Sequence, residues 1–133
     1  MITVPANKQW ELVDLRPTGK IQPVDPIADL QSGMRYADCH LDTVLTRLEF
    51  RSGKCSTTVW DPAAGLRVVQ TFDNTFRHCV VYTPPHRQAI SIEPYSCVPD
   101  ALRLEHEGIM STGLRRLAPS SSYRASIEIR AGY

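Results

Sequence analysis

Apolar and polar residues alternate one by one along much of the chain, which is the period of a β-strand with one buried face. The pattern is clearest near the end, where every second residue is apolar: Tyr123, Ala125, Ile127 and Ile129. We therefore expect a strand here with one face in the core and the other in solvent. Runs rich in β-branched and aromatic residues predict further strands at 10–15, 20–24, 41–50, 55–60, 66–72, 77–83 and 89–93.

Short turn-forming segments separate these runs. The stretches 16–19 (Arg-Pro-Thr-Gly) and 61–65 (Asp-Pro-Ala-Ala-Gly) predict turns, and the prolines of 84–87 interrupt the last pair of strands. Helix is expected only as a single turn over 99–104, beginning at a proline. Many short strands with little helix predict an all-β fold, an antiparallel β-sandwich, and the length predicts a single domain over residues 1–133.

The balance of charged residues indicates which class of ligand the chain could bind. Fifteen Lys and Arg against fourteen Asp and Glu leave a formal net charge of +1, so no global field attracts nucleic acid or an anionic membrane. A neutral or polar ligand fits better. No stretch approaches the roughly 20 apolar residues that span a bilayer, and the first residues lack the features of a signal peptide. We therefore expect a cytoplasmic protein with neither a nucleic-acid nor a membrane partner.

Four cysteines are widely spaced, with no C-x-x-C pair: Cys39, Cys55, Cys79 and Cys97. In a chain that is not exported this spacing favours reduced thiols, mostly buried, over disulfides. The pairs Cys39-His40 and His78-Cys79 could supply zinc ligands, but the spacing of a structural zinc fold is absent. We favour core cysteines beside ordinary strand histidines and expect no metal site.

Glu93 stands out because it follows the apolar strand 89–92 and precedes Pro94, which lacks a backbone donor and is expected to end the ladder. A carboxylate at a sheet end is expected to be partly desolvated. Desolvation raises the proton affinity of a carboxylate, as a general base near neutral pH requires. The alternative is a glutamate at the rim that accepts hydrogen bonds from loop amides.

Several segments resemble one family in the same order along the chain. Tyr82-Thr83-Pro84, Ile92-Glu93-Pro94 and Pro99-Asp100-Ala101, followed by Leu117 and Pro119, resemble the C-terminal part of aldose 1-epimerases (galactose mutarotases). Upstream, the segments 16–24, 29–30 and 41–45 are similar to further elements of that family, so the resemblance runs from residue 6 to residue 129. The chain departs from the family at Ser120-Ser121, where Gly-Glu is usual.

This resemblance implies the C-terminal part of the galactose mutarotase-like supersandwich and a ligand that is an aldohexose or related sugar. It implies that Glu93 is the catalytic base of α/β-anomer interconversion by ring opening, without a cofactor, and that Asp42 binds sugar hydroxyls. Tyr82 could stack on the sugar ring. The alternatives are a turn aspartate that caps backbone amides at the start of strand 41–50 and a buried strand tyrosine.

The family's histidine general acid comes from an N-terminal half that has no counterpart in this sequence. None of the four histidines (His40, His78, His86 and His106) lies in a matching motif. Strands that pair with that half would present bare edges, so we expect a homodimer or a partner chain that covers the exposed sheet edge. Two other hypotheses stay open: a non-catalytic carbohydrate-binding sandwich, and an assembly domain with a vestigial site.

Overall fold

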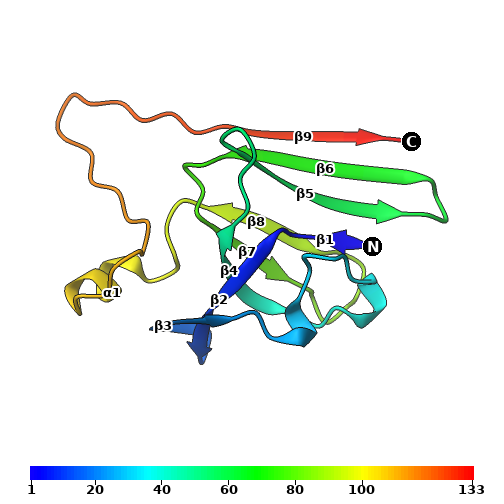
Figure 1. Ribbon diagram of the computed structural model, residues 1–133, viewed down its shortest axis with the longest axis horizontal. Helices are drawn as coiled ribbons and strands as arrows, with labels where there is room; N and C mark the ends of the chain where they lie inside the picture. Colours follow the sequence, from blue (N-terminus) through cyan, green and yellow to red (C-terminus); the bar gives the residue numbers. More distant parts are fainter.

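Two antiparallel β-sheets face each other in the computed structural model, which describes residues 1–133 (Figure 1). The four-stranded sheet has the order β1 (Ile2–Thr3), β5 (Lys54–Asp61), β6 (Leu66–Asp73) and β9 (Ile127–Gly132). The five-stranded sheet has the order β3 (Arg16–Pro23), β2 (Ala6–Val13), β4 (Asp42–Leu48), β7 (His78–Tyr82) and β8 (Ser91–Tyr95). The predicted all-β sandwich is confirmed.

Helix is sparse, as expected. The one α-helix, α1, spans Ala101–His106, slightly later than the predicted turn, and two short 3₁₀ turns span Pro26–Ala28 and Tyr36–Asp38. No helix of the chain combines the length and the apolar character that crossing a bilayer demands.

The main core fills the space between the two sheets. Its largest fully buried side chains include Ile2, Leu30, Leu45, Phe72 and Val81. Each such side chain contributes about 1.5–3 kcal/mol through the removal of apolar surface from water. Strand alternation places the four strand residues on the faces that the two sheets turn toward each other, and Leu30 joins them from the loop after Pro26–Ala28.

Three of the four cysteines belong to this core. Cys39, Cys55 and Cys79 are buried, Cys97 is half-buried, and all are free thiols. Burial raises the pKa of the Cys55 thiol to about 11 and that of the Cys79 thiol to about 12. These thiols therefore stay protonated and unreactive at neutral pH.

The five-stranded sheet is also covered on its outer face. There Trp10 and Val44 pack against α1 and the residues before it, with Val98, Ala101 and Leu104 in the same cluster. The middle of the outer face is therefore buried as well. Beyond α1, the chain returns to β9 along one side of the molecule (Figure 1).

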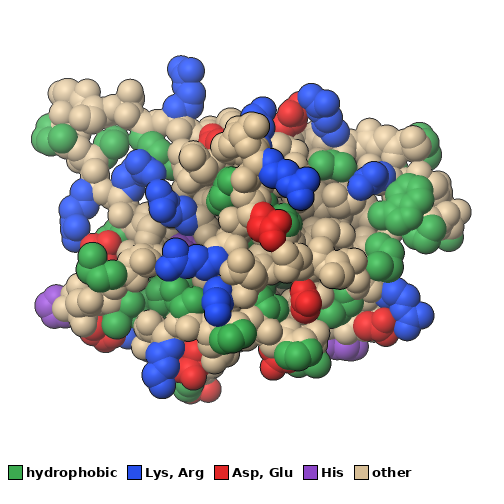
Figure 2. Space-filling model, in the orientation of Figure 1, with side chains coloured by type: hydrophobic (Ala, Val, Ile, Leu, Met, Phe, Trp, Pro, Cys, Tyr) green, Lys and Arg blue, Asp and Glu red, His purple; other side chains and the backbone are tan.

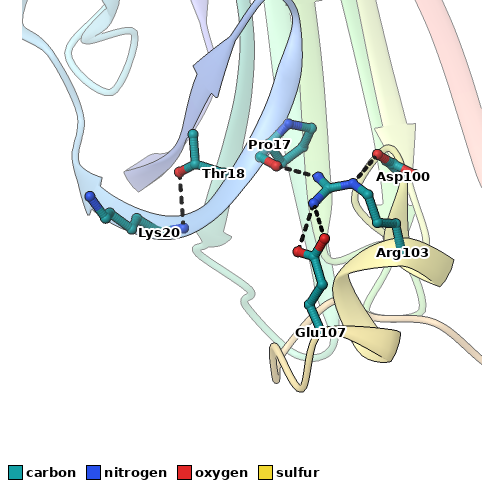
Figure 3. Close-up of polar contacts among 6 residues, drawn as sticks. All are labelled: Pro17, Thr18, Lys20, Asp100, Arg103 and Glu107. Atoms are coloured by element: carbon teal, nitrogen blue, oxygen red, sulfur yellow. Dashed lines mark hydrogen bonds and ion pairs between the residues drawn. The ribbon is translucent and has the colours of Figure 1, made fainter.

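One arginine ties α1 to the opposite edge of the five-stranded sheet (Figure 3). The guanidinium of Arg103 donates to the carbonyl oxygen of Pro17 at 2.7 Å, to Asp100 at 2.6 Å and to Glu107 at 2.7 and 2.9 Å. These carboxylates raise the pKa of Arg103. The planar, five-donor guanidinium suits this role because it can bond two carboxylates and a carbonyl at once.

The predicted turn of the first hairpin was wrong. Residues 16–19 lie inside β3, and the chain reverses at Asp14 and Leu15, whose φ angles are 49° and 63°. Two consecutive positive φ values are typical of the type I′ turn that matches strand twist. Pro17 is tolerated within β3 because this is an edge strand.

The strand predicted over 123–129 begins only at Ile127, and the expectation of a buried face is wrong because all six residues of β9 are exposed. Cross-strand register places Ile127 opposite the buried Phe72, so its side chain points to the inner side of the sheet. Ile127 and Ile129 are nevertheless 44% and 63% exposed. Alternation identified the inward side correctly, but little of the molecule covers it.

The strand that carries Glu93 also differs from expectation. It begins at Ser91 and runs on to Tyr95, with Pro94 paired opposite Cys79, so the ladder does not end at Glu93. Because β8 is the edge strand, the nitrogen of Pro94 can face away from β7 without the loss of a ladder bond.

Gly113 offers a test of the packing around the segment after α1. Its φ is +80°, and an added Cβ would overlap the carbonyl oxygen of Ser96 and lie 3.1 Å from the Cα of Cys97. We expect Gly113→Ala to destabilise the fold by about 1–3 kcal/mol more than Gly53→Ala. Gly53 has a similar φ of +76° with open space around its Cα, so it controls for backbone strain. Chemical denaturation measures both; equal losses would contradict the close approach.

Candidate functional site

The structure brings the three predicted site residues to one face of the five-stranded sheet. Asp42 on β4 lies directly opposite Tyr82 on β7, and Tyr82 lies opposite Ser91 on β8. Directly opposite residues project to the same side, and so does Glu93, two positions beyond Ser91. The strands of Asp42 and Glu93 are two spacings apart, roughly 10 Å. This is the outer face, the one that α1 covers further along.

Glu93 is half-buried, as expected for a partly desolvated carboxylate. Its Oε1 accepts a hydrogen bond from the Ser91 hydroxyl at 2.5 Å. The pKa of the Tyr95 hydroxyl is raised, first by its interaction with the Glu93 carboxylate and then by partial burial of the phenol. No loop amide donates to it, so the alternative of a rim glutamate bonded to loop amides does not describe this residue. The Ser91 hydroxyl, on the same strand, therefore holds the carboxylate.

Asp42 and Tyr82 line an open hollow of about 460 Å³, together with His40, Thr83 and Arg87 among others. The Asp42 side chain is exposed and accepts no hydrogen bond within the chain, so it does not cap the start of β4. Tyr82 is 36% exposed, and the alternative of a buried strand tyrosine is therefore wrong. Glu93 lies beside this hollow, one strand further, and is not among its lining residues.

Arg87 shapes the hollow. Its guanidinium lies 4.5 Å from the ring centroid of Tyr36 and donates to the carbonyl oxygens of Tyr36, at 2.6 Å, and Cys39. These contacts hold the loop between β7 and β8 against the Tyr36–Asp38 turn. No sequence signal connects residues that lie about fifty positions apart.

The histidines divide sharply by environment. His78 is fully buried: its Nδ1 accepts from the Trp10 indole at 3.3 Å, and its Nε2–H donates to the carbonyl oxygen of Thr112 at 3.1 Å. Burial lowers the pKa of His78 to about 4, and the positive charges of Arg77 and Arg47 act in the same direction. This imidazole is neutral at pH 7 and both of its nitrogens are engaged.

The other histidines are exposed. His106 lies on α1, and His86 accepts from the Gln88 amide in the loop after β7. Only His40 lines the hollow with Asp42 and Tyr82.

No group of three or more His, Cys, Asp or Glu side chains is arranged to hold a metal ion. Compared with known families, the chain matches no family model.

Acid titration tests the buried imidazole. Because the pKa of His78 is lowered in the folded state, its contribution is complete above about pH 6.5 and is lost as the pH falls toward 4. We expect the free energy of unfolding to decrease over this window by up to about 3 kcal/mol on account of His78. Urea denaturation at pH 7, 6, 5 and 4 measures the slope.

The control for this titration is His78→Gln, which keeps a donor and an acceptor but does not titrate. Its unfolding free energy should depend less steeply on pH between 6.5 and 4. An unchanged slope in this variant would show that other groups cause the acid sensitivity.

Proposed function

We propose that this chain is a sugar-binding β-sandwich of the aldose 1-epimerase type, which interconverts the α and β anomers of an aldohexose or related sugar. Glu93 removes the proton of the anomeric hydroxyl, Asp42 binds sugar hydroxyls, and Tyr82 packs against the ring. The observation that carries the proposal is the cross-strand register, which places these three side chains on one face of adjacent strands.

The surroundings of each residue support its role. A hydrogen bond from the Ser91 hydroxyl fixes the orientation of the Glu93 carboxylate. A positioned base of this kind accelerates proton transfer by about 10²–10⁴-fold. Asp42 has no partner within the chain, so its carboxylate is free to accept bonds from hydroxyl groups. A hollow of about 460 Å³ accommodates a single sugar ring.

Ring opening also requires a proton on the ring oxygen. His78 is unsuited to this step because it is neutral and its Nε2–H is already donated to Thr112. His40 is the histidine that shares the hollow with Asp42 and Tyr82. Within this proposal His40 donates that proton.

The second candidate is a sandwich that binds sugar without catalysis. The position of Glu93 one strand outside the lined hollow favours it, because a sugar held by Asp42 and Tyr82 would have to extend toward β8 to meet the base. A third outcome, neither binding nor activity, would leave a vestigial site in an assembly domain.

Polarimetry of freshly dissolved glucose or galactose tests catalysis. The chain should accelerate mutarotation, and Glu93→Gln should reduce this acceleration by about 10²-fold or more. Glu128→Gln on β9 is the matched control, since it removes a carboxylate from the other sheet. Equal rates for the chain and Glu93→Gln would refute the catalytic role.

Binding is measured separately, by shifts of amide resonances on addition of sugar. Shifts confined to the strands of Asp42 and Tyr82, without mutarotation, would favour the non-catalytic alternative. No shifts and no activity would reject both sugar functions.

The proposal includes a cytoplasmic location. Its support is the state of the cysteines: all four are free thiols and three are buried. Free thiols persist in a reducing compartment, whereas secreted domains of this size commonly contain disulfides.

We further propose that two copies associate through β9. Its outer edge is unpaired, and the inward-facing Ile127 and Ile129 remain largely exposed. An unpaired edge beside apolar side chains is a template for strand addition. Association would bury both features together.

Gel filtration at micromolar concentration should therefore give a dimer, and Ile129→Lys should give a monomer. Leu102→Lys on α1 is the control, because it places the same charge at a similarly exposed residue away from β9. A well-folded monomer for the unmodified chain would refute association.

A further inference from the structure

The largest hollow of the molecule lies away from the residues proposed to bind sugar. Its volume is about 560 Å³, within the range of small-molecule sites. The ends of β3 and β4, the start of β7 and the segment 111–116 form its walls. It lies on the outer face of the five-stranded sheet, at the end opposite Asp42, since Thr46 and His78 pair with each other four residues along their strands from Asp42 and Tyr82.

Four arginines line this hollow: Arg47, Arg77, Arg115 and Arg116. No acidic side chain is among the lining residues. The whole chain has a formal charge of only +1, so the positive charge is concentrated here rather than spread over the surface. Lys and Arg side chains gather accordingly on the side of the molecule where α1 and the returning segment lie (Figure 2).

Two of these guanidinium groups have no internal partner. Arg47 and Arg77 take part in none of the ion pairs of the chain and donate no side-chain hydrogen bond. Arg116 is paired with Glu105 at 3.1 Å, and the guanidinium of Arg115 lies 4.3 Å from the ring centroid of Tyr123. The hollow therefore holds two uncompensated charges, with two further arginines at its wall.

The backbone is shaped to present these charges. Arg47, the residue before the last of β4, has a φ of 54°, a left-handed conformation that costs about 1–2 kcal/mol in a non-glycine residue. It interrupts the alternation of the strand: Leu45 and Leu48 both enter the inner core, while Arg47 is exposed toward the hollow. Strain of this kind is typical of ligand sites.

The facing wall is fixed by buried hydrogen bonds. The carbonyl oxygen of Thr112 accepts from His78 at 3.1 Å and from the amide of Val98 at 2.8 Å, and its hydroxyl donates to Glu105 at 3.0 Å. The segment that carries Arg115 and Arg116 is thereby anchored beside Arg77. All four arginines are exposed residues, and each contributes to the lining of this hollow.

We propose that this hollow binds the phosphoryl group of a small ligand, with Arg47 and Arg77 as its principal contacts. A phosphate dianion offers several acceptor oxygens to planar, multiply donating guanidinium groups, which bind it in bidentate fashion. Nucleic acid fits less well, because it requires an extended basic surface rather than one concave cluster on a nearly neutral chain.

The proposal is tested on the full chain with inorganic phosphate, pyrophosphate and glucose 6-phosphate, followed by amide resonance shifts at constant ionic strength. We expect saturable shifts at residues 46–48 and 111–116 below about 10 mM, the range of a weak specific site. Tighter binding of glucose 6-phosphate than of inorganic phosphate would assign a phosphorylated small molecule, and the reverse would assign free phosphate. Glucose alone should shift none of these amides, which separates this site from the sugar site.

The decisive variant is Arg47→Gln with Arg77→Gln, which should weaken pyrophosphate binding by at least about tenfold. The matched control, Arg67→Gln with Arg124→Gln, removes the same charge from residues outside the hollow and should bind as the unmodified chain does. Circular dichroism checks that both variants fold.

Three results would overturn the proposal. They are equal weakening in the control variant, tighter binding of citrate than of pyrophosphate, and tighter binding of a single-stranded oligonucleotide than of pyrophosphate. The last would assign a nucleic-acid surface instead.

Discussion

The arrangement of the outer face depends on one buried imidazole. His78 receives a hydrogen bond from Trp10 on β2 and gives one to Thr112, so it joins two strands of the sheet to the segment that follows α1. Both bonds require the neutral ring, because a protonated Nδ1 could no longer accept. The buried surroundings and the nearby positive charges of Arg47 and Arg77 maintain that state. The imidazole thus supports the wall of the arginine-lined hollow without carrying charge into it.

The five-stranded sheet separates two kinds of chemistry on a single face. At one end Asp42 and Tyr82 form an exposed polar site beside Glu93; at the other, arginines surround a basic hollow. The cluster of Trp10, Val44 and the residues of α1 lies on the same face. The opposite face of this sheet is largely packed against the second sheet.

The features that the sequence predicts well are those determined by residues close to one another in the chain. The turn between β5 and β6 was predictable because Asp61 bonds nearby amides and Gly65 adopts a positive φ, both within a few residues. The turn at Asp14 and Leu15 was not, since leucine carries no signal for a left-handed conformation. Alternation likewise identified the inward side of β9, but whether other atoms cover that side depends on tertiary structure.

The candidate site residues likewise divide into those that local sequence could indicate and those that depend on tertiary structure. Glu93 was singled out as a candidate from its own strand, whereas the role proposed for Asp42 came from a family resemblance rather than from spacing. The arginine cluster had no signal at all, because Arg47, Arg77 and Arg115 come together only through strand order. A contact between segments that are far apart in the sequence produces no periodic pattern in either segment.

The two edge strands β8 and β9 differ in how well they could pair with a strand of another chain. Pro94 deprives β8 of a donor next to Glu93, whereas β9 contains no proline and offers an uninterrupted row of amides. A strand of another chain would therefore pair better with β9, which belongs to the sheet without the proposed sugar-binding residues. Pro94 therefore disfavours strand addition at the sheet edge beside the Glu93 carboxylate.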